Sequence, residues 1–474
     1  MPLSALDDKT GKPVDWWFAY KLPNLTNAGK TKQGTALGAA NGTEYLYCDA
    51  NSPSLPHGLS PHPKILESGA LLSTIQQLRA RGKDSNIGWI FYNDEHGKID
   101  KPVTDKKTGK PKITKVPIVP DNGAFGHTKG VVAFDLDTDS AFWLLHSWPS
   151  FPSFLPKSSK VLPPAPNFGQ TFLCVTLKDV ATLDAIAKVF HEQTQPQIIE
   201  MSLPKSLDAA KFPNIVQLSK DAPPAKVPPG AVEPSDTTFA SKGGATFRLF
   251  AKSKDWLQPA ATTVDEPKDL YSDLIGPTLK VDLEVETWQD GEPDDDSDHT
   301  HTTEDIMFID LRALGINAGW HFTLHDHAKW AVSKDPDAQR ETDWVIVADI
   351  NRIDSQFERG GCGIAFQNKE LARSLHSIID MVPPPALAAR IAAGEKAAKE
   401  NEKTRDAGRT ATMKNGKAAK RAAPAKKKTP PVKKTAPAKR RAAPANKKAA
   451  PVKRKAASAR RKTAPKRKAT VKKR

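Results

Sequence analysis

The alternation of apolar and polar residues along the first 380 positions predicts a body of mixed strands and helices. Short apolar or aromatic runs bounded by turn residues are typical of strands, and they occur at residues 16–20, 45–47, 87–92, 130–136, 141–146, 171–177, 246–251, 280–288, 344–350 and 362–366. Apolar residues at helical spacing predict helices over residues 65–80, 180–191 and 369–381. Because both kinds of element alternate along the chain, we expect an α/β or α+β fold.

Polar and Pro-rich segments separate these elements and predict loops. The longest are residues 98–118, 149–168 and 203–237, together with a strongly acidic segment at 290–305. A shorter segment, Asp137-Thr138-Asp139-Ser140, joins two strand signals and has the composition of a tight turn, so these strands are predicted to form a hairpin.

Charge divides the 474 residues into two parts. Residues 411–474 contain 26 Lys and Arg, no Asp or Glu and no aromatic residue, so residues 1–410 carry a net charge of −9 although the whole chain carries +17. A segment so poor in large apolar residues buries no core, and we expect a disordered basic tail. The tail resembles the Ala-Pro-Lys tails of linker histones, and its cations are expected to bind DNA without base specificity.

The same composition argues against several classes of protein. No run of 18 apolar residues predicts a transmembrane helix, and the first residues lack the basic and apolar regions of a secretory signal. Cys48, Cys174 and Cys362 are widely spaced, which argues against a disulfide framework and a zinc site and favours free thiols. We therefore expect a cytoplasmic protein without membrane contact, or a nuclear one if the host is eukaryotic.

The acidic segment is the strongest alternative candidate for a metal site. The spacing of Asp294, Asp296, Asp298 and Asp305 is similar to that of a calcium loop, but His299 occupies the place where such a loop needs Gly. We interpret the segment as a solvated loop, and neither a metal nor another cofactor is expected.

Histidine followed two residues later by lysine is the pattern that carries candidate chemistry. Two of the four such triplets begin at His62 and His96 and lie among loop residues. The other two, His127-Thr128-Lys129 and His327-Ala328-Lys329, each lead into an apolar strand signal. On a strand this spacing places the imidazole and the ammonium group on one face.

The two strand-linked triplets belong to a diverged internal repeat. Each is followed by a turn and a second strand that ends in polar residues, at His146-Ser147 in the first copy and Asn351-Arg352 in the second. Two such copies facing one phosphate would supply two lysines to stabilise phosphoryl charge, one imidazole to attack phosphorus and another to protonate the leaving oxygen. The pattern alone also fits histidines and lysines without a catalytic role.

The ordered run of motifs resembles the deoxyribonuclease II family, within the phospholipase D superfamily. The resemblance spans about residues 11–385, and the matching stretches include Gly11–Trp17, Tyr20–Pro23, Tyr92–Asp94, Gly126–Val131, Phe142–Ser147, Phe168–Thr171, Phe250–Lys252, Asp269–Tyr271, Asp326–Trp330, Asp349–Arg352 and Arg359–Gly361.

This resemblance implies a metal-independent endonuclease that cuts DNA, favours acidic pH and leaves 3′-phosphate ends through a phosphohistidine-type intermediate. It implies two pseudo-symmetric phospholipase D-like halves with mixed sheets flanked by helices, over residues 1–185 and 186–385. A helical linker at 386–410 and the tail at 411–474 would follow. Relatives also form homodimers, so a homodimer is allowed here.

The site residues are carried over by position. The catalytic set implied by the resemblance is His127, Lys129, His327 and Lys329, and His127 is preferred as the nucleophile although the motifs alone do not decide between the histidines. Asn351 matches a phosphate-binding position, and His146 or Ser147 would occupy the corresponding place in the first half. Arg352 is a further candidate for a phosphate contact.

Two other functions fit parts of the sequence. The same chemistry would serve a phosphodiesterase that acts on RNA or phospholipid, because the fold does not determine which alcohol is esterified to the phosphate. A histone-like DNA-binding protein with a vestigial site would retain the basic tail without catalysis.

Overall fold

A computed structural model of the chain describes residues 2–25, 36–37, 40–55, 65, 68–81, 84, 86–95, 98–104, 111–117, 125–149, 151, 167–220, 232–258, 266–288, 300–321, 326–334 and 343–380. All of them belong to one unit bounded by residues 1 and 405. The predicted linker and basic tail lie outside the described residues.

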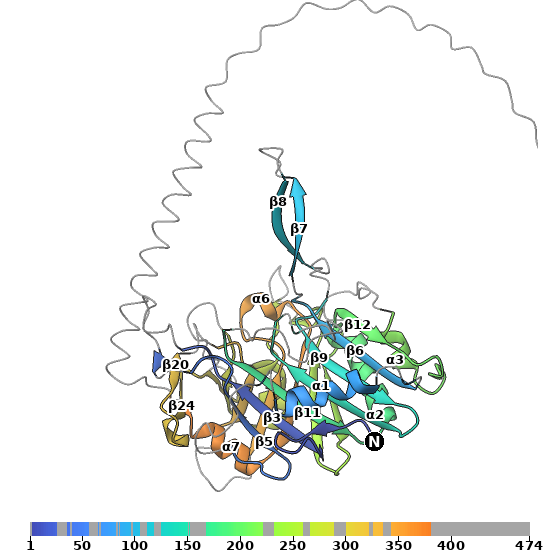
Figure 1. Cartoon of the computed structure of the whole chain (residues 1–474). Helices are drawn as coiled ribbons and strands as arrows, with labels where there is room; N and C mark the ends of the chain where they lie inside the picture. The colour runs from blue at the N-terminus through green and yellow to red at the C-terminus, as the bar shows by residue number, and fades with distance from the viewer. Residues whose placement is uncertain are drawn as a thin grey trace, which may run out of the picture. The chain divides into compact units, whose positions relative to one another are not determined.

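The first half of the chain forms a seven-stranded sheet with the order β12-β6-β9-β10-β11-β3-β5 (Figure 1). Every neighbouring pair in it is antiparallel. Its strands are β3 (Trp16–Lys21), β5 (Tyr45–Asp49), β6 (Ile87–Asn93), β9 (Lys129–Asp135), β10 (Ser140–His146), β11 (Gln170–Leu177) and β12 (Ile198–Ser202). The predicted hairpin is confirmed as β9 and β10, with Ala141 opposite Phe134.

A second seven-stranded sheet has the order β13-β14-β23-β22-β21-β17-β18. Only its edge pair, β17 and β18, is parallel. Its strands are β13 (Ser235–Ala240), β14 (Thr246–Lys252), β17 (Leu283–Glu286), β18 (Thr303–Asp305), β21 (Trp330–Ser333), β22 (Trp344–Ala348) and β23 (Gly361–Gln367).

The two sheets repeat one strand order. When the second sheet is followed from β18, its strands β21, β22 and β23 stand where β9, β10 and β11 stand in the first. In each half a helix follows the third of these strands, α2 (Val180–Val189) after β11 and α7 (Lys369–His376) after β23. Both His-x-Lys triplets therefore lead into the equivalent inner strand of their sheets, β9 and β21, each third from one edge.

Both faces of the sheets are buried, which explains the continuous apolar runs. In β3, Trp16, Phe18 and Tyr20 point into a core shared by the two sheets, whereas Trp17 points into a second core. The rings of Trp16 and Phe366 meet in the shared core with centroids 5.3 Å apart. The site is thus built on two rigid sheets rather than on isolated loops.

Helices cover the sheet faces, and α2 and α7 begin at side-chain caps. The helix α1 (Ala70–Arg81) packs its apolar side against the second core of the first sheet (Figure 1). Asp179 caps α2 by accepting a hydrogen bond from the Thr182 amide at 2.8 Å, and Asn368 caps α7 by accepting one from Leu371 at 2.9 Å.

The remaining elements are short. They are β1 (Ala5–Leu6), β2 (Pro13–Val14), β4 (Ala36–Leu37), β15 (Leu257–Gln258), β16 (Glu266–Pro267), β19 (Phe308–Asp310), β20 (Gly319–His321), β24 (Ile379–Asp380), η2 (Phe190–Thr194), α3 (Pro213–Leu218), η3 (Tyr271–Ile275), α4 (Gly276–Leu279), η4 (Leu311–Leu314) and α6 (Asp354–Phe357).

Several segments differ from the sequence prediction. The expected loop at 98–118 contains two antiparallel strands, β7 (Lys98–Thr104) and β8 (Pro111–Pro117). Their pairing uses main-chain hydrogen bonds, which leave no apolar pattern in the sequence. The expected loop at 203–237 contains α3, and β12 was not predicted. The predicted boundary between residues 185 and 186 falls inside α2, whereas the strands of the two sheets are divided between Ser202 and Ser235.

Candidate active site

The two halves hold each other's histidines through equivalent main-chain contacts. The amide of His127 donates to the carbonyl of Gly360 at 2.8 Å, and the amide of His327 donates to the carbonyl of Gly169 at 3.1 Å. Gly360 directly precedes β23 and Gly169 directly precedes β11, which are equivalent strands. Each His-x-Lys segment is therefore fixed by the opposite half, as a shared site requires.

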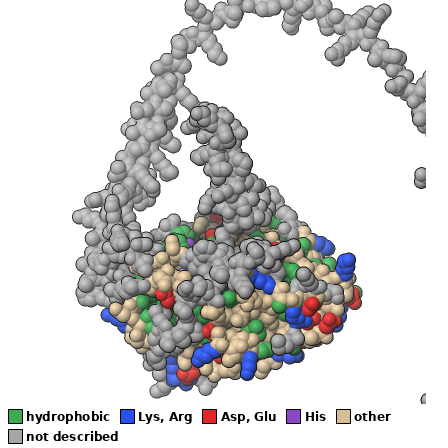
Figure 2. All heavy atoms as spheres, viewed as in Figure 1, with side chains coloured by type: hydrophobic (Ala, Val, Ile, Leu, Met, Phe, Trp, Pro, Cys, Tyr) green, Lys and Arg blue, Asp and Glu red, His purple; other side chains and the backbone are tan. Residues whose placement is uncertain are grey.

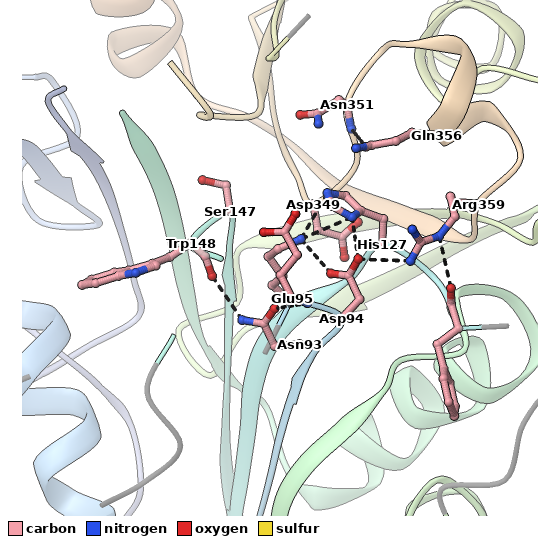
Figure 3. Close-up of polar contacts among 12 residues, drawn as sticks. Asn93, Asp94, Glu95, His127, Ser147, Trp148, Asp349, Asn351, Gln356 and Arg359 are labelled. Carbon is pink, nitrogen blue, oxygen red and sulfur yellow. Dashed lines mark hydrogen bonds and ion pairs between the residues drawn. The ribbon is translucent and has the colours of Figure 1, made fainter. Parts of the chain in front are cut away.

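A buried carboxylate orients the first histidine. Asp94, just beyond β6, contacts His127 Nδ1 through Oδ2 at 2.6 Å and accepts from Lys129 Nζ through Oδ1 at 2.8 Å (Figure 3). Lys129 Nζ also lies 3.1 Å from His127 Nε2. An ammonium group only donates, so Nε2 carries the lone pair and Nδ1 carries the proton that Asp94 accepts.

The second histidine has a different environment. His327 stacks on Phe168 with ring centroids 4.3 Å apart and an interplanar angle of 12°, and Trp288 contacts its ring at 5.0 Å. The preceding Asp326 accepts hydrogen bonds from Tyr20 and from Trp320 Nε1, as well as one from the Ala328 amide at 2.8 Å. Asp326 thereby shapes the segment that carries His327.

Burial and clustered cations oppose protonation of both imidazoles. Burial, followed by the charge of Lys329, lowers the pKa of His327 to about 3. Burial lowers the pKa of His127 to about 4, although Asp94 acts in the opposite direction. Burial and the charge of Lys129 lower the pKa of Lys329 to about 7. A site that disfavours its own positive charges is stabilised by an anion, and a phosphodiester supplies one.

Asp349 interacts electrostatically with Lys129 and Lys329, and in Figure 3 it lies with His127, whereas Asn351 lies apart from them next to Gln356. The Asn351 amide nitrogen of the main chain donates to Gln356 at 2.6 Å, while the buried side-chain Oδ1 has no hydrogen-bond partner among the described residues. Asp349 accepts from the Cys362 amide at 2.8 Å, and burial raises its pKa to about 7. Only the acceptor Oδ1 of the Asn351 side chain lacks a partner, and phosphate oxygens are acceptors too, so the phosphate contact of Asn351 stays a prediction.

The predicted counterpart of Asn351 in the first half is corrected by the strand register. Extending the β9–β10 and β21–β22 pairings by one residue places His146 opposite Lys129 and Ala348 opposite Lys329. His146 is thus equivalent to Ala348, and Ser147 to Asp349. Neither occupies the position of Asn351.

The contacts of the two side chains agree with this correction. His146 is buried, its Nδ1 accepts from the Trp148 amide at 3.2 Å, and its ring packs 4.5 Å from that of Phe151. Ser147 donates to Gln170 and accepts from the Thr171 amide at 3.0 Å. The contacts of Ser147 support the strand end and do not indicate a phosphate-binding role. The buried Nε2 of His146 has no hydrogen-bond partner among the described residues, and His146 interacts electrostatically with Lys129 and Lys329, so a phosphate contact by His146 stays a prediction.

Arg352 also differs from its predicted role. Its guanidinium is buried between two carboxylates, with Nε 3.1 Å from Asp269 and Nη1 3.0 Å from Asp305. The contacts therefore indicate that Arg352 joins elements of the second half rather than binding phosphate.

We expect Arg352→Met to lower the free energy of unfolding by about 3–5 kcal/mol, because it leaves buried carboxylates without their charge partner. Denaturant unfolding measures this loss. The control is Arg248→Met, which removes an ion pair to Asp236 that is partly exposed and should cost about 1 kcal/mol or less. Unchanged stability with lost activity would instead favour the phosphate contact.

Sequence reasoning assigned no role to Asp94 or Arg359, although both lie in the motifs that carried the resemblance. Arg359 Nη2 contacts Asp94 Oδ2 at 3.0 Å, and Arg359 Nε donates to the Phe125 carbonyl at 3.2 Å (Figure 3). Asp94 lies 33 residues before His127 and Arg359 lies 265 residues after Asp94. Contacts between residues so far apart in the sequence are not predicted by the spacing within any one motif.

The alternative metal candidate receives no support within the described residues, where no group of three or more His, Cys, Asp or Glu is placed to hold a metal ion. Asp294, Asp296, Asp298 and His299 lie outside them. None of the described helices is long and apolar enough to cross a membrane.

Paired imidazole and ammonium groups around one buried site can attack a phosphate ester, protonate its leaving oxygen and stabilise phosphoryl charge, which is the chemistry of a phosphodiesterase. Comparison with known proteins gives the family: the profile described as Deoxyribonuclease II matches residues 7–384. The chain belongs to the deoxyribonuclease II family and is a nuclease of that type. The match ends before the basic tail.

Individual relatives agree. A protein of Burkholderia pseudomallei (strain 1710b), provisionally named deoxyribonuclease-2, is 39% identical over 383 residues, covering 80% of this chain and 93% of the relative. Deoxyribonuclease-2 of Caenorhabditis elegans is 31% identical over 368 residues, covering 75% and 87%. Deoxyribonuclease-2-alpha of Rattus norvegicus is 28% identical over 376 residues, covering 79% and 93%.

Proposed function

We propose that this protein is a metal-independent endonuclease that hydrolyses DNA phosphodiester bonds with His127, Lys129, His327 and Lys329. The observation that carries the proposal is the reciprocal contact between the halves, in which Gly360 holds His127 and Gly169 holds His327. Lys129 and Lys329 both interact electrostatically with His327, and they also interact with each other. The two ammonium groups are therefore proposed to bind the same phosphate.

In the first step, His127 Nε2 attacks phosphorus. A bond forms between Nε2 and phosphorus, the bond from phosphorus to the 5′-oxygen breaks, and His327 supplies the proton that the leaving oxygen takes. Asp94 assigns the attacking role to His127, because a carboxylate on Nδ1 stabilises the positive charge that the ring acquires.

In the second step, His327 takes a proton from water while the water oxygen attacks phosphorus. The bond between phosphorus and His127 Nε2 breaks, which restores the free imidazole. The products are a 3′-phosphate and a 5′-hydroxyl. Asn351 is proposed to orient the phosphate by donating a hydrogen bond from its side-chain Nδ2 to a phosphate oxygen.

Cleavage of supercoiled plasmid in EDTA tests this function. Activity should rise as pH falls from about 8 towards about 5, because the leaving oxygen needs protonated His327, and bound phosphate raises the low pKa of that imidazole. Activity should fall again at still lower pH, where His127 becomes protonated and Nε2 cannot attack; bound phosphate raises the pKa of His127 above its value of about 4 in the free protein. No EDTA-resistant cleavage at any pH would contradict the proposal.

The same assay with RNA and phospholipid separates the alternatives. We expect DNA to be cleaved fastest. Faster RNA or lipid cleavage would favour the general phosphodiesterase, and DNA binding without any cleavage would favour the histone-like protein. A cytoplasmic location and a homodimer remain predictions that this assay does not address.

The basic tail is proposed to tether the nuclease to DNA. Residues 1–410 carry a charge of −9, and acidic and basic side chains are intermixed on the face of the described residues in Figure 2. A tail with 26 cations reverses the repulsion between such a body and DNA.

Replacing all Lys and Arg of residues 411–474 by Gln should weaken DNA binding at low salt by about 100-fold or more and flatten its salt dependence. Binding to labelled duplex at several salt concentrations measures both effects. Cleavage of a short chromogenic phosphodiester is the control and should not change. Unaltered affinity for duplex at low salt would rule out the tether.

A further inference from the structure

Arg359 and Phe168 occupy equivalent positions in the two halves. Each precedes the glycine whose carbonyl holds the histidine of the opposite half, Gly360 for His127 and Gly169 for His327. Phe168 stacks on His327, whereas Arg359 contacts Asp94, the carboxylate that holds His127. The repeat therefore carries an aromatic group toward one histidine and a cation toward the other.

The segment around Arg359 is held firmly against the first half. Lys252 is buried, and its Nζ donates to the carbonyls of Phe357 and Arg359, the latter at 2.9 Å. A Cβ on Gly360 would lie 2.8 Å from the carbonyl oxygen of Thr194, so the two main chains approach closely there. Arg359 therefore reaches Asp94 from a fixed backbone.

Arg359 and His127 use the same carboxylate oxygen. Asp94 Oδ2 lies 3.0 Å from Arg359 Nη2 and 2.6 Å from His127 Nδ1, while Oδ1 accepts from Lys129. The second guanidinium contact, from Nε to the Phe125 carbonyl, fixes the plane of the guanidinium and so the place of Oδ2. Two-point binding of this kind is specific to arginine.

We propose that Arg359 is a positioning residue that acts across the two halves: it fixes Asp94 and thereby keeps His127 with Nδ1 protonated and Nε2 directed at phosphorus. The inference rests on the proposed function, because it concerns the attacking histidine. It also assigns the two halves different tasks, since no carboxylate contact to the His327 ring is present among the described residues.

The charge of Arg359 has a second consequence. Asp94 and Lys129 contact His127 directly, and Arg359 contacts Asp94. Lys329 and His327 interact with His127 electrostatically. Asp94 favours a second proton on the imidazole, and Arg359 weakens that effect by sharing the carboxylate. Arg359 thus keeps Nε2 free for attack as the solution becomes acidic.

Steady-state plasmid cleavage in EDTA by the full-length chain tests the inference, with Arg359→Gln, Arg359→Lys and Arg248→Gln compared with the wild type. We expect Arg359→Gln to lower kcat by about 10–100-fold while KM changes less than about threefold. The acidic limb of its pH profile should move to higher pH. Arg359→Lys should recover the wild-type limb and part of kcat, because it restores charge without two-point geometry.

The control and the contrary outcomes are distinct. Arg248→Gln removes a surface arginine that pairs with Asp236 and should leave kcat and the pH profile unchanged. Unaltered kcat and acidic limb in Arg359→Gln would overturn the inference, as would an Arg359→Lys variant no better than Arg359→Gln. If Arg359→Gln is unfolded by circular dichroism, a wild-type kcat in folded Arg359→Lys overturns it. Failure of the proposed function is separate: the wild type itself would not cut in EDTA.

Discussion

His127→Ala and His327→Ala should each lower plasmid cleavage in EDTA by about 10,000-fold, and the double variant should be little worse than either one. In the proposed mechanism each histidine performs a step that the other cannot replace, because His127 has a carboxylate on Nδ1 and His327 has none among the described residues. His191→Ala changes a histidine of η2 whose side chain takes part in none of the site contacts described above, so it is the matched control and should retain wild-type activity.

A substrate with an activated leaving group separates the two roles. Thymidine 3′-(p-nitrophenyl phosphate) releases nitrophenolate, which needs no proton. We expect His327→Ala to regain at least about 100-fold of its lost rate in the first step with this substrate, and His127→Ala to regain almost nothing. Recovery by His127→Ala instead would make His327 the nucleophile and His127 the proton donor. Equal recovery by both variants would contradict the division of roles.

Asp94→Asn should be the next most damaging change, with a loss in kcat of about 100–1000-fold. A carboxamide can donate to Nδ1 and so favour the tautomer that protonates Nε2. It also removes the charge that Lys129 and Arg359 contact. Burial opposes ionisation of Asp94, but His127 and Lys129 outweigh it and hold its pKa well below the ordinary value, so the carboxylate persists at acidic pH.

Kinetics together with thermal unfolding measure the effect of Asp94→Asn. Asp236→Asn is the control, because Asp236 also pairs with an arginine but lies at the edge of the second sheet. Near-normal kcat in a folded Asp94→Asn enzyme would show that the tautomer of His127 is set without Asp94. A large loss of stability at unchanged kcat would make Asp94 a structural residue.

The sequence predicted the central strands and the two His-x-Lys segments because both depend on local patterns. The apolar runs at 130–136 and 171–177 became β9 and β11, since residues buried on both faces leave a continuous signal. Polar segments are harder to predict: the composition of residues 98–118 predicts a loop, although the segment contains β7 and β8, because main-chain hydrogen bonds have no compositional signature.

Contacts between the halves were beyond the reach of sequence pattern. Asp94 and Arg359 meet across 265 residues, and neither stands at a set spacing from a His-x-Lys segment. Adjacency to Asn351 suggested a phosphate role for Arg352, yet Arg352 is buried against Asp269 and Asp305. The distance from His to the polar strand end likewise misplaced His146 and Ser147, because the turn after β21 is longer than the turn after β9.

Trapping the covalent intermediate tests the central claim most directly. Single-turnover reaction of His327→Ala with labelled thymidine 3′-(p-nitrophenyl phosphate), quenched in alkaline detergent, should leave a phosphoramidate on the protein because hydrolysis of the intermediate lacks its base. Mass spectrometry should place the label on His127, and His127→Ala should take up none. A label on His327 of the wild type, or turnover of the nitrophenyl ester with no labelled protein at any time, would contradict the mechanism.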